Sequence, residues 1–191
     1  MNRSDCLRIA SINVRGLNDR NKRLAVFEYF EKSNFSLVLL QETKTNNALE
    51  NEIRREWHNR KAIINSTPST SSSGGSMVLI NSHRISILDS ILTPDGRCIV
   101  LNIDFCGSKF HVVNAYFPID VNEKGSFITS LYPIVSSQYP IIFGGDFNLT
   151  LDPKLDRFPP RTVRDTHSKD LKQLIDMFDL MDVCRNIYIS L

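Results

Sequence analysis

Carboxylates, carboxamides, a phenol and cations cluster in four short segments of this sequence. Each segment begins in an apolar run, and the four cover residues 11–17, 39–44, 113–118 and 143–148. Their side chains suited to chemistry are Glu42, Asp146, Asn13, Asn148 and Tyr116, with the cations Arg15 and Lys44 nearby. A hard cation such as Mg²⁺ takes one or two protein carboxylates together with water and substrate phosphate, and phosphodiester cleavage needs donors around the non-bridging oxygens. The set therefore predicts metal-assisted phosphoryl chemistry.

Other catalytic classes lack their signatures in this sequence. There is no nucleophile elbow for a serine or cysteine hydrolase, and no glycine-rich loop ends in Lys-Ser or Lys-Thr as a P-loop does. The four cysteines form no C-x-x-C pair and have no histidine at zinc-ligand spacing; they are Cys6, Cys98, Cys106 and Cys184. We expect reduced, partly buried thiols.

Hydrophobic patterning predicts more strands than helices. Short apolar runs with β-branched residues predict strands at residues 7–12, 37–40, 62–64, 77–80, 85–92, 98–105, 110–113 and 141–143. Apolar residues at helical spacing predict helices at residues 20–32, 122–136 and 168–180. No helix separates the five strands from about residue 62 to residue 113, so these strands should be largely antiparallel. A layered α/β sandwich accounts best for this order.

The four polar segments come at the carboxyl ends of predicted strands. In α/β folds the loops at that edge of a sheet commonly carry the site, because a rigid scaffold holds them. We therefore expect the four segments to share one rim and to form one pocket. The small polar residues from 66 to 75 predict a flexible loop and not a domain linker.

Length and composition are those of one globular domain. The chain has 191 residues, 41% of them hydrophobic, and a formal net charge of +2, which by itself does not indicate nucleic acid. No stretch reaches the roughly 18 apolar residues of a membrane span, and the charged N-terminal segment leaves no apolar core for a signal peptide. We expect a nuclear or cytoplasmic protein without a membrane partner.

The segments N-V-R-G-L, L-L-Q-E-T-K, N-A-Y-F-P and G-G-D-F-N, in this order, resemble the successive motifs of the exonuclease-endonuclease-phosphatase superfamily. Within it, N-V-R-G-L followed by Q-E-T-K is most similar to the endonuclease domain of LINE-type (non-long-terminal-repeat) retrotransposons. The resemblance runs from about residue 7 to residue 185. It implies a four-layer sandwich of two mainly antiparallel sheets flanked by helices, and Mg²⁺-dependent nicking of target duplex DNA. It also implies that Mn²⁺ can substitute and that a reverse transcriptase follows in the parent polyprotein.

The resemblance further implies a role for each matching residue. Glu42 would anchor the magnesium ion, and Asn13 would help to order the metal or the phosphate. Tyr116 would donate to a phosphate oxygen. Asp146 would orient or deprotonate the attacking water, and Asn148 would hold the phosphate or that carboxylate. The plainer alternatives are that Asn13 and Asn148 are turn residues and that Tyr116 belongs to the core.

The sequence departs from the family pattern toward its C-terminus. The final family motifs, Ser-x-Arg-hydrophobic-Asp and Ser-Asp-His, are absent, so we expect a single endonuclease-like domain over residues 1–191 that lacks its last strands. This favours a chain without the parent activity. Asp165-Thr166-His167 precedes the last predicted helix and is no substitute for the closing histidine. Ile119 and Cys184 replace an Asn and a Trp that relatives usually carry, which indicates a drifting copy.

Functions of other classes stay open beside the nuclease. The chain could be a non-catalytic remnant that binds nucleic acid and needs neither metal nor Asp146, or a phosphoesterase of the phospholipid or inositol-phosphate branch. Four cations in the loop after G-G-D-F-N could contact a DNA groove or could simply be solvated; they are Lys154, Arg157, Arg161 and Arg164.

Overall fold

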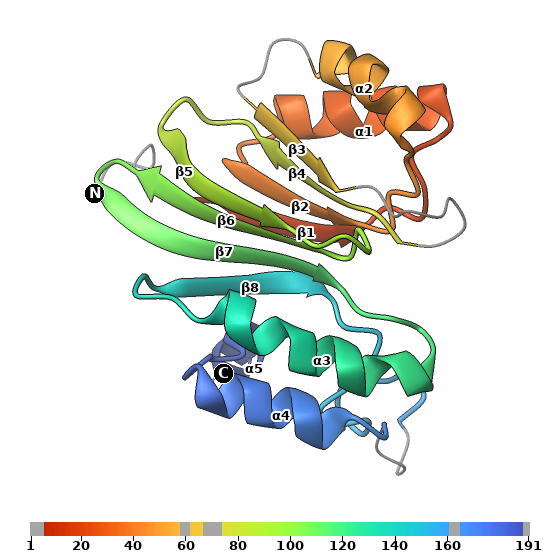
Figure 1. Cartoon of the computed structure of the whole chain (residues 1–191), viewed down its shortest axis with the longest axis vertical. Coiled ribbons are helices and arrows are strands. Elements are labelled where there is room, and N and C mark those ends of the chain that lie inside the picture. Colours follow the sequence, from red (N-terminus) through yellow and green to blue (C-terminus); the bar gives the residue numbers. More distant parts are fainter. Residues whose placement is uncertain (1–5, 58–61, 67–73, 161–164, 189–191) are drawn as a thin grey trace. The chain divides into compact units, whose positions relative to one another are not determined.

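The computed structural model describes residues 6–57, 62–66, 74–160 and 165–188 (Figure 1). The chain divides into two compact units. The first comprises Met1–Phe117 and Tyr139–Asp146, and the second comprises Pro118–Gln138 and Phe147–Leu191. The described strands all belong to the first unit.

Two four-stranded sheets make up most of the described part of the first unit. The first sheet has the order β1 (Ile9–Asn13), β2 (Leu37–Gln41), β4 (Ser76–Ile80), β3 (Ala62–Ser66), and the second has the order β5 (Ile85–Leu92), β6 (Cys98–Phe105), β7 (Ser108–Tyr116), β8 (Ile141–Asp146). In each sheet one pairing is parallel, β1 with β2 and β7 with β8, and the other two are antiparallel. The eight predicted strands and their mainly antiparallel arrangement are confirmed.

The two sheets face each other across an apolar core (Figure 1). Buried side chains from β2 and β4 meet buried side chains from β6 and β7: Leu37, Leu39, Val78 and Ile80 on one side, and Ile99, Leu101, Ile103 and Val112 on the other. Strand β2 is buried on both faces, because Val38 and Leu40 belong to a second cluster. A strand buried on both faces requires a continuous apolar run, which explains the pattern of residues 37–40.

Helices α1 (Arg20–Lys32) and α2 (Glu50–Glu56) cover the outer face of the first sheet (Figure 1). They contribute Phe27, Phe30 and Ile53 to the cluster that contains Val38 and Leu40. The predicted helix at residues 20–32 is confirmed, and the Asp19 carboxylate caps it by accepting a hydrogen bond from the Lys22 amide. Helix α2 has a single buried apolar residue, Ile53, so no helical periodicity in its sequence predicts it.

The second unit contains α3 (Val121–Val135), α4 (Ser168–Met177) and α5 (Val183–Tyr188). The predictions of α3 and α4 are confirmed. Helix α4 ends at Met177, before the predicted residue 180, and Asp179 just beyond it has the left-handed conformation that commonly terminates helices (φ 50°). The rings of Tyr132 and Phe178 lie 6.0 Å apart between α3 and the end of α4.

The predicted α/β class, with two mainly antiparallel sheets and flanking helices, is confirmed. The single domain over residues 1–191 stays a prediction. The loop predicted at residues 66–75 lies mostly outside the described residues. None of the described helices has the length and apolar composition that a membrane-spanning segment needs.

A buried arginine joins α1, α2 and the loop after β1. The Arg23 side chain is 1% exposed; its Nη1 donates to the carbonyl oxygens of Leu17 (2.8 Å) and Asn18 (3.2 Å), and its Nη2 donates to Glu52 Oε1 (2.9 Å) and Glu56 Oε1 (3.1 Å). Burial raises the pKa of Glu56, but the hydrogen bond and charge of Arg23 outweigh this effect and hold it below the ordinary 4.5. The carboxylate therefore stays charged in the folded protein.

Replacing Glu56 by Gln keeps the side-chain shape and removes this charge. We expect Glu56→Gln to lower the free energy of unfolding by about 2–3 kcal/mol near neutral pH, because Arg23 then keeps one anionic partner in a buried place. Urea denaturation measures the loss. Since folding lowers the pKa of Glu56, its contribution is complete above 4.5 and disappears as the pH falls through the folded value, so the two proteins should converge in acid. Glu28→Gln, in the exposed pair with Lys32, is the control, and an equal loss there would contradict the argument.

Two glycines let β8 approach its neighbours just before Asp146. A Cβ at Gly145, whose φ is 154°, would lie 1.9 Å from the carbonyl oxygen of Ala115 in β7. A Cβ at Gly144 would lie 2.8 Å from Leu39 Cδ1 in the opposite sheet. The first clash is with backbone and cannot be relieved by a rotamer change, whereas the second is with the end of a flexible side chain.

We expect Gly145→Ala to destabilise the protein by about 3 kcal/mol or more, because β8 must move away from β7. Gly107→Ala is the matched control: Gly107 also has a left-handed φ (85°), but a Cβ there meets nothing within 4 Å. It should cost only the backbone strain, about 1 kcal/mol. Thermal unfolding of both variants, followed by circular dichroism, measures the difference; similar melting temperatures would rule out the close approach.

Candidate active site

The two parallel strand pairs bring the carboxyl ends of four strands together. In the first sheet Asn13 is in register with Gln41, so Asn13 and Glu42 end neighbouring strands; in the second sheet Tyr116 is in register with Asp146. Hydrogen bonds then connect the two sheets at this end. The expected shared rim is therefore present for residues of the first unit.

One carboxamide joins the two carboxylates. Asn13 Nδ2 donates to Glu42 Oε2 at 3.0 Å and to Asp146 Oδ2 at 2.7 Å. Asn13 Oδ1 accepts a hydrogen bond from the Arg15 amide at 2.9 Å, so the residue also forms the turn that the plainer alternative predicts. The two side-chain amide protons of Asn13 thus hold the carboxylates of Glu42 and Asp146 close together, although two like charges repel each other.

Glu42 is held as a charged group. Its side chain is 17% exposed, and Oε1 lies 2.8 Å from Lys44 Nζ. Burial raises the pKa of Glu42, but hydrogen bonds from Lys44 and Asn13 lower it further than burial raises it, so the net pKa lies below its ordinary value. Glu42 also has a left-handed φ of 55°, a conformation that is uncommon for residues other than glycine and is often found at functional sites.

Tyr116 is a buried phenol with a raised pKa. The residue is 2% exposed, its backbone N–H donates to the Arg97 carbonyl at 2.7 Å, and the Arg97 guanidinium carbon lies 5.4 Å from its ring centre. Burial, followed by the charge of Glu42, raises the pKa of Tyr116 above 10.0. The hydroxyl therefore stays protonated at neutral pH and can act as a hydrogen-bond donor. Its burial agrees with the core alternative as well, and the two roles are compatible.

Two buried carboxamides beneath the rim were not identified from the sequence. Gln41 Nε2 donates to Asn114 Oδ1 at 2.7 Å, and Asn114 Nδ2 donates to the carbonyl oxygens of Leu40 (3.0 Å) and Met77 (3.1 Å). These bonds join β2 and β4 to β7. Both residues lie inside the polar segments, one position beyond the strands predicted at residues 37–40 and 110–113, and this position was the signal that could have found them.

Asn148 belongs to the second unit, two positions after Asp146. Its φ is 45°, and its carbonyl oxygen accepts a hydrogen bond from Lys124 Nζ at 2.5 Å. Lys124 is buried in α3. This contact fixes the backbone at Asn148 within the second unit, and the role of the Asn148 side chain stays a prediction.

The predicted DNA contacts are described only in part. Arg157 Nη2 lies 2.9 Å from both carboxylate oxygens of Asp165, so its charge is paired within the second unit. Arg161 and Arg164 lie outside the described residues. DNA binding by these arginines stays a prediction.

Two described histidines make contacts away from a phosphate role. His111 Nδ1 lies 2.7 Å from Asn102 Oδ1 on the neighbouring strand. His167 Nδ1 lies 2.6 Å from Asp170 Oδ2, and its Nε2 lies 2.9 Å from the Val121 carbonyl oxygen. These bonds place His167 at the junction of α3 and α4, and its exclusion as a substitute for the closing histidine stays a prediction.

The donor set of the rim fits a magnesium ion better than a zinc ion. Among the described residues no three His, Cys, Asp or Glu side chains gather around one point. Zinc sites need three or four such ligands. Mg²⁺ keeps several waters and uses one or two carboxylates, and Glu42, whose position is fixed by the Asn13 amide, can supply one of them.

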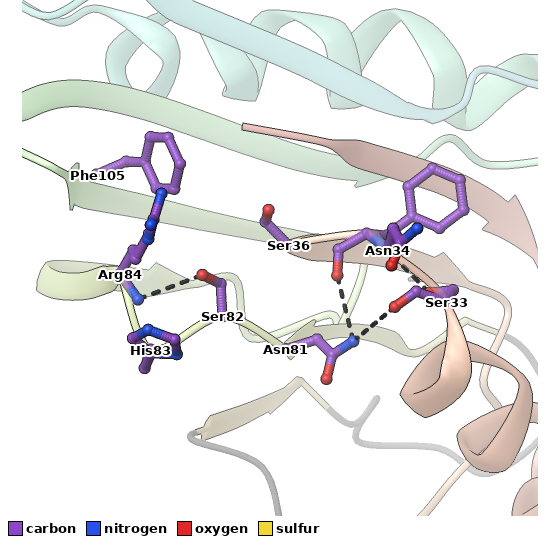
Figure 2. Close-up of a pocket in the computed structure, with 9 residues that line it drawn as sticks. Ser33, Asn34, Ser36, Asn81, Ser82, His83, Arg84 and Phe105 are labelled. Carbon is purple, nitrogen blue, oxygen red and sulfur yellow. Dashed lines mark hydrogen bonds between the residues drawn. The ribbon is translucent and has the colours of Figure 1, made fainter. Parts of the chain in front are cut away.

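A hollow of about 320 Å³ lies at the amino end of β2, whereas Glu42 follows the carboxyl end of that strand. Figure 2 shows the residues that line the hollow. Its lining includes Ser36, Asn81, Ser82, His83 and Arg84. The side-chain Nδ2 of Asn81 donates to the carbonyl oxygens of Phe30 (2.9 Å) and Phe35 (3.2 Å), and so fixes the turn between α1 and β2. We interpret this hollow as a junction of loops.

Sequence comparison places these residues in a known family. The sequence matches the Endonuclease/Exonuclease/phosphatase family over residues 10–176. The Transposon TX1 uncharacterized 149 kDa protein of Xenopus laevis is 30% identical in an alignment of 182 residues, which covers 94% of this chain and 14% of that protein. The chain therefore spans a small part of this relative.

Two solved structures share the fold. A humanized D. rerio TDP2 with 14 mutations has a TM-score of 0.54 and 22% identity, over 74% of this chain and 62% of that one. TDP2 from Caenorhabditis elegans has a TM-score of 0.55 and 18% identity, over 75% of this chain and 49% of that one. At these identities the likeness supports the fold alone.

The buried carboxamide pair makes a testable contribution to stability. Asn114→Leu leaves Gln41 Nε2 and two carbonyl groups short of a partner, so we expect a loss of about 3 kcal/mol in the free energy of unfolding. Gln41→Leu should cost somewhat less. The double variant should lose less than the sum, because each single change already removes the hydrogen bond between Gln41 Nε2 and Asn114 Oδ1. Additive losses in a urea-denaturation cycle would refute the coupling.

Proposed function

Because the chain belongs to the Endonuclease/Exonuclease/phosphatase family, we propose that it hydrolyses phosphodiester bonds in duplex DNA with the help of a divalent cation. The observation that supports this most directly is the Asn13 amide, which holds the Glu42 and Asp146 carboxylates together at the end of two sheets. The carboxylates of Glu42 and Asp146 lie near the protonated hydroxyl of Tyr116 and the ammonium of Lys44. Such a combination of groups suits a reaction that involves both a bound cation and a phosphate.

Glu42 and Asn13 would hold Mg²⁺, or Mn²⁺ in its place. The bound ion supplies positive charge to the phosphate and leaving oxygens. Asp146, oriented by Asn13, accepts a proton from the attacking water. The Tyr116 hydroxyl donates to a non-bridging phosphate oxygen, and Asn148 is proposed to hold the phosphate or Asp146. The lowered pKa of Glu42 keeps this ligand charged, and the raised pKa of Tyr116 keeps this donor protonated.

The biological role that we propose is nicking of target DNA for a mobile element. The similarity to a transposon protein of Xenopus laevis supports this context. In that context a reverse transcriptase in the parent polyprotein would use the nick, and the reaction on chromosomal DNA would take place in the nucleus. Arg157, Arg161 and Arg164 remain candidates for contacts to the DNA backbone.

Relaxation of supercoiled plasmid by the purified chain tests the activity. We expect nicking that requires Mg²⁺ or Mn²⁺, stops with chelator, and falls by about 10²-fold or more in Asp146→Ala. Lys172→Ala, an exposed change in α4, is the control for handling and purity. Metal-dependent nicking would overturn the expectation drawn from the absent closing motifs.

A DNA-binding measurement and a soluble phosphodiester substrate, used beside the relaxation assay, separate the other function classes. A folded chain that binds duplex DNA but never nicks it would exclude the nuclease and favour the non-catalytic remnant. Hydrolysis of a soluble phosphodiester that duplex DNA fails to inhibit would instead favour the phospholipid or inositol-phosphate branch.

A further inference from the structure

Lys44 stands beside Glu42 on a backbone segment held in an unusual conformation. Both residues have left-handed φ angles, 53° and 55°, and Thr43 between them is fully buried. The segment is fixed by hydrogen bonds on both sides: the Gly16 amide donates to the Glu42 carbonyl (2.7 Å), and the Lys44 amide donates to the Gly74 carbonyl (3.1 Å). Two uncommon conformations in a clamped segment indicate that the position of the Lys44 side chain is built into the fold.

The Lys44 ammonium uses one of the two Glu42 oxygens. Nζ lies 2.8 Å from Oε1, while Oε2 accepts the Asn13 amide at 3.0 Å. The lysine stem runs beside Gly16, where a Cβ would lie 3.7 Å from Lys44 Cδ. Its side chain is 37% exposed, so the ammonium can still move into solvent or toward another anion.

A divalent cation on Glu42 and an ammonium on the same oxygen exclude each other. The Asn13 amide binds Oε2 and the Lys44 ammonium binds Oε1, so a cation that binds at Oε1 comes close to the ammonium, and two positive groups at one oxygen repel strongly. The metal therefore has to displace Lys44. The displaced ammonium remains tethered next to Tyr116, on whose hydroxyl its charge also acts, and this is where the phosphate would lie.

We propose that Lys44 is a tethered counter-cation of Glu42, which a divalent metal displaces and which then binds the substrate phosphate. This inference rests on the proposed function. Metal binding and phosphodiester binding are coupled as a result: metal frees Lys44 for the phosphate, and the phosphate holds Lys44 away from Glu42, so each ligand increases the affinity for the other.

Mn²⁺ binding without substrate, followed by the paramagnetic resonance of the free ion, tests the displacement. We expect Lys44→Met to bind Mn²⁺ about fivefold more tightly than the unchanged chain, the equivalent of one partly exposed ion pair. Arg15→Met is the matched control. It removes an equal charge that acts on Glu42 through space, and should change the affinity by less than about twofold because Arg15 is exposed and screened.

The coupling is tested in the Asp146→Asn background, which should bind DNA without cutting it. Mn²⁺ should raise its affinity for a fluorescent duplex, measured by anisotropy, and the increase should be about threefold smaller or more after Lys44→Met. If Mn²⁺ raises the DNA affinity equally with and without Lys44→Met, the proposal that Lys44 moves to the phosphate is wrong.

Glu42→Gln separates failure of this inference from failure of the proposed function. If Mn²⁺ binding does not depend on Glu42, the proposed metal site itself is wrong. If Glu42→Gln abolishes Mn²⁺ binding while the Mn²⁺ affinity of Lys44→Met equals that of the unchanged chain or of Arg15→Met, the proposed displacement is wrong. The proposed metal site then stands. Circular dichroism confirms that each variant is folded, and Lys44→Gln repeats the measurement with a polar side chain.

Discussion

Two carboxylates at one rim repel each other, and a single amide group makes their proximity tolerable. The two Asn13 N–H groups reach Glu42 in its own sheet and Asp146 in the facing sheet. This requires both sheets to end at the same level with their carboxyl ends together. The parallel pairs β1 with β2 and β7 with β8 provide that alignment, although most pairings in the two sheets are antiparallel.

Residues buried beneath the rim also keep the two sheets aligned. Gln41 and Asn114 bond to each other and to carbonyl groups of β2 and β4, so the sheets are joined by directional contacts as well as by apolar packing. Gly144 and Gly145 allow β8 to come close to both neighbours immediately before Asp146. Apolar packing alone has no direction and would tolerate small shifts between sheets. The buried carboxamides restrict such shifts directly beneath the carboxylates.

The fold could be predicted from the sequence where periodicity was strong. Strands with continuous or alternating apolar residues and the three longer helices were found, whereas α2 and α5 were too short to show a pattern. The sequence could not reveal that β4 and β5, only a few residues apart, belong to different sheets, because a hairpin and a crossing between sheets have the same local pattern. The polar segments pointed to Asn13, Glu42, Tyr116 and Asp146, but the ion pair of Lys44 and the stacking of Arg97 on Tyr116 depend on side-chain directions that spacing does not specify.

Left-handed residues recur in three of the four polar segments: Arg15, Glu42, Lys44 and Asn148 have φ angles of 49°, 55°, 53° and 45°. Asn, Asp and Gly adopt this conformation most readily, and β-branched residues adopt it least. Only a few residue types can therefore replace these residues without straining the backbone. A copy in which Glu42 becomes Asn or Gly would lose the carboxylate that we propose as a cation ligand and would keep its backbone turn. In such a lineage chemistry can decay well before the fold does, and a well-folded descendant would be no sign of a working enzyme.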